Sequence, residues 1–345
     1  MMIDWVTAKT AFHAPMVISG GSFMSINPDG TIEYETPKRM QLRGSHDGSM
    51  TVRTTLVDHQ GHTEQIELSG NPVKFLQGHN VWGSDDLPNL VAETLMKVSS
   101  LLNIKQPAST LERLPSGTLS RTDLNRMYDL GSRENVLAYL NHLAKNSRTR
   151  TQSAITRGST VYHNKTSRRW SAKSYSKGQE VELARNNKQG SIALPPSVIA
   201  YADTMLRNEI TLKSNELRHA QLHTIGAWNT VDCESVFEDY YGRITMPDQE
   251  IMLIPADLPS SVRLTYVSWK EGHDLRTLLS RPTYYRHRKQ LLEHGIDISI
   301  PSGKVQPDQT NVTPFIRTIT LKPASIPRWA YGTDLLFEPR KLCKF

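Results

Sequence analysis

The amino-acid sequence predicts an α+β protein: an antiparallel sheet with helices on one face, followed by a smaller helical domain. Runs with the two-residue alternation of strands dominate the chain up to about residue 220, and helical spacing interrupts them in a few places. The character changes at residues 258–300, where basic helical segments follow one another. We therefore expect a sheet domain at residues 1–220 and a second domain at residues 221–345. Within the second domain, residues 258–300 resemble a helix-turn-helix with a wing.

Composition limits the class of protein. The 345 residues are 37% hydrophobic, which is enough for a sizeable core. The net charge of +7 indicates a polyanionic partner, although a mildly basic protein without such a partner is the alternative. No apolar run approaches the ~20 residues of a membrane span, and the first residues do not form a signal peptide. We expect a soluble, cytoplasmic protein with no membrane contact.

Cysteine usage limits the possible metal sites. The chain has two cysteines, Cys233 and Cys343, so neither a disulfide scaffold nor a four-cysteine zinc site is possible. Any metal ion would be held by oxygen or histidine ligands.

The first 80 residues are expected to form strands joined by tight turns. Turn-forming residues stand at positions 27–30, 46–48 and 60–61. Residues 72–83 follow, and their glycines suggest a tight turn or a close approach of the backbone to a ligand. His79 lies in this stretch and is a candidate metal ligand, although hydrogen bonding within the fold is the more frequent role of such a histidine.

Three helices are expected in the first domain. Apolar residues recur at helical spacing from Leu87 to Leu102, directly after the cap at residues 84–86. Ser132 caps a second helix, and Pro196–Met205 forms a third. These helices should pack on the sheet.

Two strands carry acidic residues on their polar faces. Asp123 lies in the strand Thr118–Leu124, and Glu209 lies in the strand Leu206–Leu212. Phosphodiester transfer commonly uses a divalent cation held by carboxylates, so we expect Asp123 and Glu209 to bind Mg²⁺ or Mn²⁺. The alternative is that these acids form ion pairs with nearby arginines. If they are not the ligands, His79 is the next candidate.

A hairpin at residues 159–180 carries the candidate nucleophile. Alternation along its second strand places Tyr175 on one face with Lys173 and Lys177. Neighbouring cations should lower the pKa of the phenol and favour the phenolate, the form that attacks phosphorus. An exposed strand with a solvated basic face is the alternative. The cations expected to hold a DNA backbone here are Arg168, Arg169 and Lys173.

Three helical segments follow in the second domain. They cover residues 259–271, 274–279 and 283–294, and alternating isoleucines at 296–300 predict a strand that would form the wing. The last helix has an apolar stripe for packing and a basic outer face that would contact DNA, while an ordinary helical hairpin is the alternative. The residues of that outer face are Arg286, Arg288 and Lys289.

Four blocks of sequence resemble a known family, the gene II replication initiators of filamentous bacteriophages, which are the phage and plasmid replication proteins of the II/X type. These blocks are Pro72–Leu87, Leu119–Asp123, Ser159–Glu180 and Arg207–Glu209. The resemblance implies a nickase that opens the plus strand at the origin of double-stranded phage DNA. It also implies that a tyrosine becomes joined to the 5′ phosphate and that the displaced single strand is later closed into a circle. The host replicative helicase and polymerase are the implied protein partners. Tyr175 occupies the position of that family's nucleophile.

On this interpretation, Lys177 would stabilise the charge of the pentavalent phosphorane beside Tyr175. The sequence lacks the His-hydrophobic-His triplet of related rolling-circle initiators, so the metal assignment rests on the two acids named above. Two other classes stay open: a non-catalytic DNA-binding regulator and a tyrosine recombinase. The sequence assigns no role to Tyr162, on the neighbouring strand.

Overall fold

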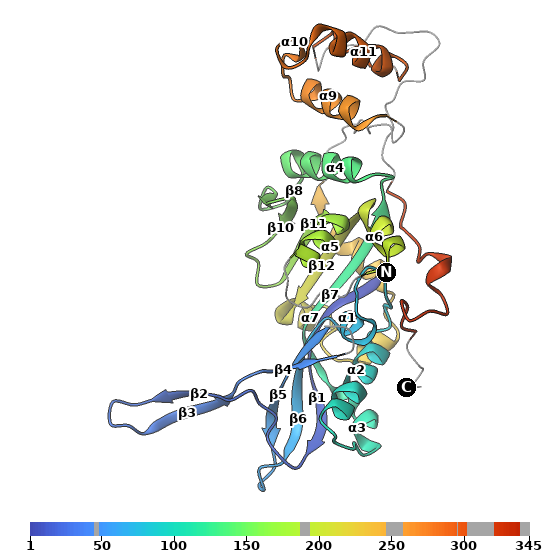
Figure 1. Cartoon of the computed structure of the whole chain (residues 1–345). Coiled ribbons are helices and arrows are strands. Elements are labelled where there is room, and N and C mark those ends of the chain that lie inside the picture. The colour runs from blue at the N-terminus through green and yellow to red at the C-terminus, as the bar shows by residue number, and fades with distance from the viewer. Residues whose placement is uncertain (45–47, 187–193, 246–257, 295, 302–320, 339–345) are drawn as a thin grey trace.

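The computed structural model describes residues 1–44, 48–186, 194–245, 258–294, 296–301 and 321–338. Within them, nine strands form one antiparallel sheet in the order β4-β5-β6-β1-β7-β12-β11-β10-β9, which confirms the predicted α+β class (Figure 1). In chain order these strands are β1 (Met2–Ala14), β4 (Met40–Arg43), β5 (Ser49–Val57), β6 (Thr63–Gly70), β7 (Thr118–Asp129), β9 (Ile155–Arg157), β10 (Thr160–His163), β11 (Trp170–Ser176) and β12 (Met205–Lys213). Two small sheets pair β2 (Ser22–Ile26) with β3 (Ile32–Pro37), and β8 (Arg148–Thr149) with β13 (Ile244–Thr245).

The helices of the main body are α1 (Pro72–Gln77), α2 (Leu87–Leu101), α3 (Ser109–Glu112), α4 (Arg133–Asn146), α5 (Lys177–Asn186), α6 (Pro196–Asp203), α7 (Ser214–His219) and α8 (Cys233–Tyr241). The predicted caps are confirmed, because the side chains of Asp86 and Ser132 accept hydrogen bonds from backbone N–H groups in the first turns of α2 and α4. The helix α5 was not predicted. Its first residues, 177–180, belong instead to the end of the predicted hairpin.

The sheet has an apolar face that carries the main core. Leu124, Ala172 and Ile210 are cross-strand neighbours on this face, and they pack against α2 and α8. The helix α4 covers the same face further along, over Val161 and Leu206. Helices α5 and α6 instead pack with Met127 and Met205, whose side chains belong to the opposite face. The prediction of helices on one face is therefore correct for α2, α4 and α8 but wrong for α5 and α6.

Residues on both sides of position 220 contribute to this core. Trp228, Phe237 and Tyr240 are buried against the apolar face. Near the other end of the chain, residues 321–338 return to the sheet, where the Ala324 backbone N–H donates to the Met127 carbonyl at 2.8 Å. The packing therefore does not coincide with the predicted division into residues 1–220 and 221–345.

A separate cluster is formed by α9 (Ser260–Lys270), α10 (Leu275–Leu278) and α11 (Arg281–Leu292). These three helices lie beyond α4 in Figure 1, and Arg263 of α9 donates to the Glu134 carboxylate of α4 at 3.2 Å. Their number and order match the sequence prediction. The predicted strand at residues 296–300 is wrong, because Ile296 and Ile298 are buried against the helices in a turn instead. A winged-helix arrangement is therefore not confirmed.

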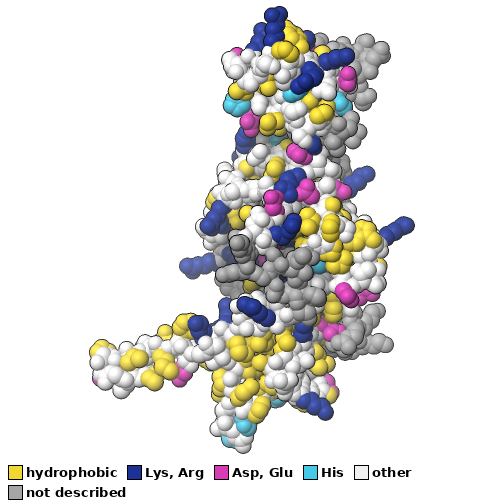
Figure 2. Space-filling model, in the orientation of Figure 1, with side chains coloured by type: hydrophobic (Ala, Val, Ile, Leu, Met, Phe, Trp, Pro, Cys, Tyr) yellow, Lys and Arg dark blue, Asp and Glu magenta, His cyan; other side chains and the backbone are white. Residues whose placement is uncertain are grey.

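The β2–β3 hairpin projects from the body of the molecule (Figure 1). Its turn at residues 27–30 is as predicted, since the Gly30 N–H donates to the Asn27 carbonyl at 2.9 Å. Apolar side chains on it are exposed, as Figure 2 shows. The turn between β5 and β6 at residues 60–61 is also confirmed, whereas residues 46–47 of the third predicted turn lie outside the described residues. No helix among the described residues is long and apolar enough to cross a membrane.

Candidate active site

A polar cavity of about 470 Å³ opens on the face of the sheet opposite the main core. It lies over β1, β7, β12, β11 and β10, and its far wall is formed by α1 and α5. The acidic and tyrosine residues that line it are Asp4, Asp123, Tyr162, Tyr175, Glu180 and Glu209, and its cations are Lys74, Arg121 and Lys173. The structure therefore brings Tyr175, Asp123 and Glu209 together, as the sequence predicted.

A β-bulge in β1 adds Asp4 to this cavity. The pairing of β1 with β7 shifts between Ile3 and Trp5, so that Asp4 is the extra residue opposite β7. Such a bulge re-aims a side chain, and here Asp4 and Trp5 both line the polar cavity. Simple alternation along β1 would have placed Asp4 and Trp5 on opposite faces, which explains why the sequence did not predict Asp4 as a site residue.

The Tyr175 hydroxyl donates a hydrogen bond to Oε2 of Glu209 at 3.3 Å. The other oxygen of that carboxylate, Oε1, lies 2.8 Å from Nζ of Lys173, its direct cross-strand neighbour. The same ammonium group lies 5.3 Å from the centre of the Tyr175 ring. The phenol is thus oriented by a carboxylate that is itself held by a cation.

The prediction that neighbouring cations lower the pKa of Tyr175 is wrong. Burial raises the pKa of Tyr175 well above 10, since it opposes the charged form, and the positive charge of Arg207 offsets this only in part. Tyr175 has only 8% of its surface exposed. The side chain therefore needs a proton acceptor to become nucleophilic, and Glu209 is in position to serve as one.

Glu209 holds a proton more tightly than an ordinary carboxylate does, so its ionised form is the stronger proton acceptor. Burial raises its pKa to about 8, and the nearby negative charges of Asp4 and Asp123 add to the effect, while Lys173 partly opposes it. Glu209 has 1% of its surface exposed. A group whose pKa lies near neutrality is suited to proton transfer at physiological pH.

The carboxylates supply oxygen ligands of the kind that Mg²⁺ prefers. Asp123 and Glu209 are diagonal neighbours on the same face, because Thr211 stands opposite Asp123 and Asn125 stands opposite Glu209. Each is paired with a cation, Asp123 with the Arg121 guanidinium at 2.5 and 2.8 Å and Glu209 with Lys173. Within the part of the chain that the structure describes, no three His, Cys, Asp or Glu side chains are grouped closely enough to hold a metal ion. Two carboxylates together with water and substrate oxygens are the donor set that fits.

Arg207 forms a buried network beneath the cavity. Its guanidinium has no exposed surface, lies 3.4 Å from the Asp4 carboxylate and donates to the Val81 carbonyl at 2.8 Å. Asp4 also accepts hydrogen bonds from the side-chain amides of Asn71 and Asn80, at 2.8 and 3.0 Å. Arg207 lies on the same face of β12 as Glu209, where it holds Asp4 and residues 80–81 in place.

Lys177 does not share the face of Tyr175, which corrects the sequence prediction. The strand β11 ends at Ser176, and Lys177 is the first residue of α5. Its ammonium group is fully buried, where it donates to Oδ1 of Asn80 at 2.8 Å and to the carboxylate of Glu180. Burial lowers the pKa of Lys177 to about 8, with a further contribution from the charge of Arg207. This geometry makes Lys177 a positioning residue, while Lys74 and Lys173 are the lysines that line the cavity.

His79 lies outside the cavity and is buried against residues near the C-terminus. Its Nε2 is 2.9 Å from the carbonyl oxygen of Leu335, and its ring packs edge-on against Trp82 at 5.0 Å. The Gln77 side-chain amide lies 3.3 Å from its Nδ1. This geometry agrees with the structural role that the sequence left open, and it gives His79 no place in a metal site near Tyr175.

The three cations expected to bind DNA near the hairpin lie on different sides of the sheet. Arg168 and Lys173 line a second hollow, which adjoins the cavity of Tyr175. Arg169 lies on the other side of the sheet, where it forms an ion pair with Glu216 beside Trp170 and Tyr240. The predicted placement of Arg169 is therefore wrong, because the regular strand begins only at Trp170.

The basic residues of α11 also differ from one another. Arg286 and Lys289 are on the outer side of the helix, as predicted. Arg288 instead makes two hydrogen bonds of 2.7 Å with the Asp297 carboxylate, and the Arg288 guanidinium holds the pKa of that carboxyl well below its usual range. Arg288 thus ties α11 to the turn after it, so its guanidinium is engaged within the helical cluster.

Comparisons with known proteins cover nearly the whole chain. The N-terminal family model of the replication-associated protein encoded by phage gene II matches residues 2–231, and the C-terminal model of the same protein matches residues 255–335. The chain is also 36% identical, over 354 aligned positions and the full length of both proteins, to the replication-associated gene II protein of Enterobacteria phage I2-2. The chain therefore belongs to the family of gene II replication-associated proteins of bacteriophages.

Proposed function

We propose that this protein is the rolling-circle replication initiator of its phage, and that it nicks and rejoins the plus strand of the origin DNA through Tyr175. The observation that carries the proposal is the hydrogen bond from the Tyr175 hydroxyl to Glu209 on the floor of a cavity lined by carboxylates and cations. Membership of the gene II protein family supports a role in phage DNA replication. The buried phenol, its proton acceptor and a neighbouring ammonium group are the parts that phosphoryl transfer requires.

In the nicking step the Tyr175 oxygen forms a bond to phosphorus as the phenol proton passes to Glu209. The bond from phosphorus to the 3′ oxygen of the preceding nucleotide breaks, and that oxygen leaves as a 3′ hydroxyl after it takes up a proton from water. The product is a 5′-phosphotyrosine. Closure runs in reverse, with the 3′ hydroxyl of the displaced strand attacking the phosphotyrosine and Tyr175 regaining its proton. Lys173 lies beside the phenol, where an ammonium group stabilises charge on the phosphate oxygens.

A divalent cation, Mg²⁺ or Mn²⁺, is part of the proposal. Asp123 and Glu209 would hold it, and Asp4 would add negative charge next to them. When bound, such an ion would neutralise the non-bridging oxygens of the scissile phosphate. Because each carboxylate is already paired with a cationic side chain, the ion would have to share Asp123 with Arg121 and Glu209 with Lys173.

The nucleic-acid partners in this proposal are the double-stranded origin and the single strand that is displaced from it. The outward-facing cations Arg286 and Lys289 of α11 would contact the duplex. Strand displacement itself would be the work of the host replicative helicase and polymerase, which the initiator would leave with a free 3′ end.

Two other functions fit the site less well. A non-catalytic DNA-binding regulator would have no use for two tyrosines, two lysines and four acids around one cavity. A tyrosine recombinase surrounds its nucleophile with several arginines and a histidine, whereas the residues that line this cavity include one arginine, Arg121, and no histidine.

The test is a nicking assay on supercoiled plasmid that carries the phage origin. Tyr175→Phe should bind the plasmid but form no relaxed product, while Tyr162→Phe, the matched change on the neighbouring strand, should nick at a rate close to that of the unmodified protein. A 5′-labelled fragment should remain attached to the unmodified protein under denaturing conditions, and peptide mapping should place the label on Tyr175. Efficient nicking by Tyr175→Phe, or a label on another residue, would overturn the assignment.

A further inference from the structure

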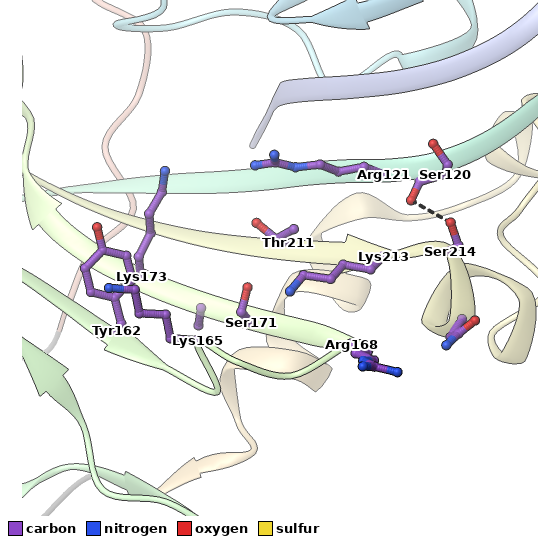
Figure 3. Close-up of a pocket in the computed structure, with 12 residues that line it drawn as sticks. Ser120, Arg121, Tyr162, Lys165, Arg168, Ser171, Lys173, Thr211, Lys213 and Ser214 are labelled. Atoms are coloured by element: carbon purple, nitrogen blue, oxygen red, sulfur yellow. Dashed lines mark hydrogen bonds between the residues drawn. The ribbon is translucent and has the colours of Figure 1, made fainter. Parts of the chain in front are cut away.

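A second hollow of about 570 Å³ adjoins the cavity of Tyr175 on the same face of the sheet, and Figure 3 shows the side chains that line it. The two hollows share Arg121, Tyr162 and Lys173 in their linings, so they form one continuous depression. Five of the twelve residues that line the second hollow are lysine or arginine, and none is acidic. This distribution differs from the mixed charges around Tyr175 and provides a path for a polyanion that leads to the nucleophile.

Tyr162 stands at the junction of the two hollows. It pairs across the strands with Lys173, which places it on the same face as Tyr175 and makes the two tyrosines diagonal neighbours. Its ring is half-buried, and Nζ of Lys165 lies 4.4 Å from the ring centre. Lys165 lies over one face of the ring, so the other face is the one on which a nucleobase could stack.

The turn between β10 and β11 carries the cations of the outer part of the groove. Asn164 has a positive φ of 51°, which lets the chain reverse tightly, and Lys165 and Arg168 lie on the turn. Lys213 of β12 donates from Nζ to the Ser167 carbonyl and thus fixes the turn to the sheet. Figure 3 shows the side chains of Lys165, Arg168 and Lys213 around the same hollow.

We infer that this groove binds single-stranded DNA, with Tyr162 stacking on the base next to the scissile phosphate and Lys165 and Arg168 contacting the backbone further along. Only an unpaired base exposes its flat face to the ring, so the groove favours a single strand over a duplex. The inference rests on the proposed function for the position of the scissile phosphate. Binding of DNA in the groove needs no cleavage, so binding in the groove and cleavage by Tyr175 can be tested separately.

The experiment measures binding of a fluorescent oligodeoxynucleotide of about 16 nucleotides to the full-length Tyr175→Phe protein by anisotropy. Adding Tyr162→Ala should weaken binding about tenfold or more, because one stacked base is lost, while Tyr162→Phe should retain the affinity. Tyr34→Ala, which removes an exposed tyrosine of the β2–β3 hairpin, is the matched control and should have no effect. Unchanged binding by Tyr162→Ala would contradict the inference that Tyr162 stacks on a base.

The salt dependence tests the cations. Replacing Lys165 and Arg168 by alanine should reduce the slope of log affinity against log salt by about 0.7 for each phosphate that is no longer neutralised, which is the value for a single strand. Lys105→Ala, an exposed lysine in the segment between α2 and α3, should leave the slope unchanged. The losses of affinity should be smaller for a duplex of the same sequence and length, and equal losses on both would show a general phosphate-binding surface instead of a single-strand groove.

An abasic nucleotide moved step by step along the oligonucleotide locates the stacked base. At the position that stacks on Tyr162, the abasic site should weaken binding to the parent protein. With that oligonucleotide, Tyr162→Ala should cause no further loss of affinity. Additive losses at every position would contradict the inference. If instead the phosphotyrosine forms on Tyr162 in the protein that retains both tyrosines, the proposed function fails at Tyr175 while the binding results still test the groove.

Discussion

At the scale of single residues, Asp4 is the acid on which the site depends most for its shape. Its carboxylate faces the fully buried guanidinium of Arg207 and accepts hydrogen bonds from two asparagines. Removing one partner of a buried ion pair leaves the other charge uncompensated, so we expect Asp4→Ala to lower the free energy of unfolding by about 3 kcal/mol. Urea unfolding measures the change. Asp29→Ala, at the exposed hairpin turn, is the control, and equal effects of the two changes would contradict the prediction.

Glu209 should make metal binding depend on pH. Its pKa is about 8, and a metal ligand must be ionised, so below pH 8 the ion has to displace a proton. We expect the affinity of the Tyr175→Phe protein for Mn²⁺, measured by electron paramagnetic resonance, to rise about tenfold per pH unit up to pH 8 and then level off. Glu209→Gln should weaken binding and remove this dependence. Glu216→Gln is a matched control, because the pKa of that buried carboxyl is lowered by its partners. A flat profile in the parent protein would exclude Glu209 as a ligand.

At the scale of elements, the helix α11 carries two arginines with different surroundings within one turn. Arg288 is tied to Asp297, whereas Arg286 faces outward. Arg288→Ala should therefore destabilise the cluster of α9, α10 and α11. In thermal unfolding, the transition of this cluster should then occur at a lower temperature than in the unmodified protein. Arg286→Ala should leave that transition unchanged and weaken binding to origin duplex by ~1–3 kcal/mol if it contacts a base. Loss of origin preference in Arg288→Ala without loss of stability would contradict this division of roles.

The β2–β3 hairpin should be dispensable for folding. Its apolar side chains, including Phe23, Ile26 and Tyr34, are each at least half exposed, so they contribute little to the core. Replacing residues 22–37 by two glycines between Gly21 and Lys38 should change the free energy of unfolding by less than about 1 kcal/mol. Urea unfolding tests this expectation, and a large loss of stability would mean that the hairpin supports the sheet.

At the scale of the whole molecule, the sequence predicted most of the helices and strands but not which of them pack together. Alternation and caps identified β7, β10, β11, β12, α2 and α4, because each is a local pattern. The α5 start at Lys177 was missed, since the hairpin strand passes directly into the helix and Ser176, whose Oγ accepts a hydrogen bond from the Gln179 N–H, is also the last residue of that strand. Burial of α8 against the sheet was also missed, because no local pattern specifies which face of a distant sheet a helix covers.

The site was predictable to the extent that strand alternation specifies it. Asp123, Tyr175 and Glu209 are on regular strands and do line one cavity. Asp4 depends on a bulge and Asn80 on a loop, neither of which alternation describes. The direction of the Tyr175 pKa shift was predicted wrongly for a different reason. The sequence shows which charges are near but not how deeply the phenol is buried.

The segment at residues 321–338 should stabilise the sheet domain. Trp329 packs edge-on against Trp82 at 5.3 Å, and the Leu335 carbonyl accepts hydrogen bonds from Trp82 and His79. Ending the chain at residue 320 should therefore expose the core around Trp82 and lower the unfolding midpoint of the sheet domain. Trp329→Ala should give a smaller loss in the same direction. A truncated protein as stable as the full chain would show that the segment only rests on the surface.

This return of the chain also sets an order of events during synthesis. The helical cluster of residues 258–301 emerges from the ribosome before residues 321–338, yet those later residues complete the packing around α5 and α6 next to Tyr175. A partly made chain thus carries its helical cluster before the packing around α5 and α6 is complete. Translation to the end of residues 321–338 is therefore the event that closes the apolar cluster around Trp82, Val181 and Val198.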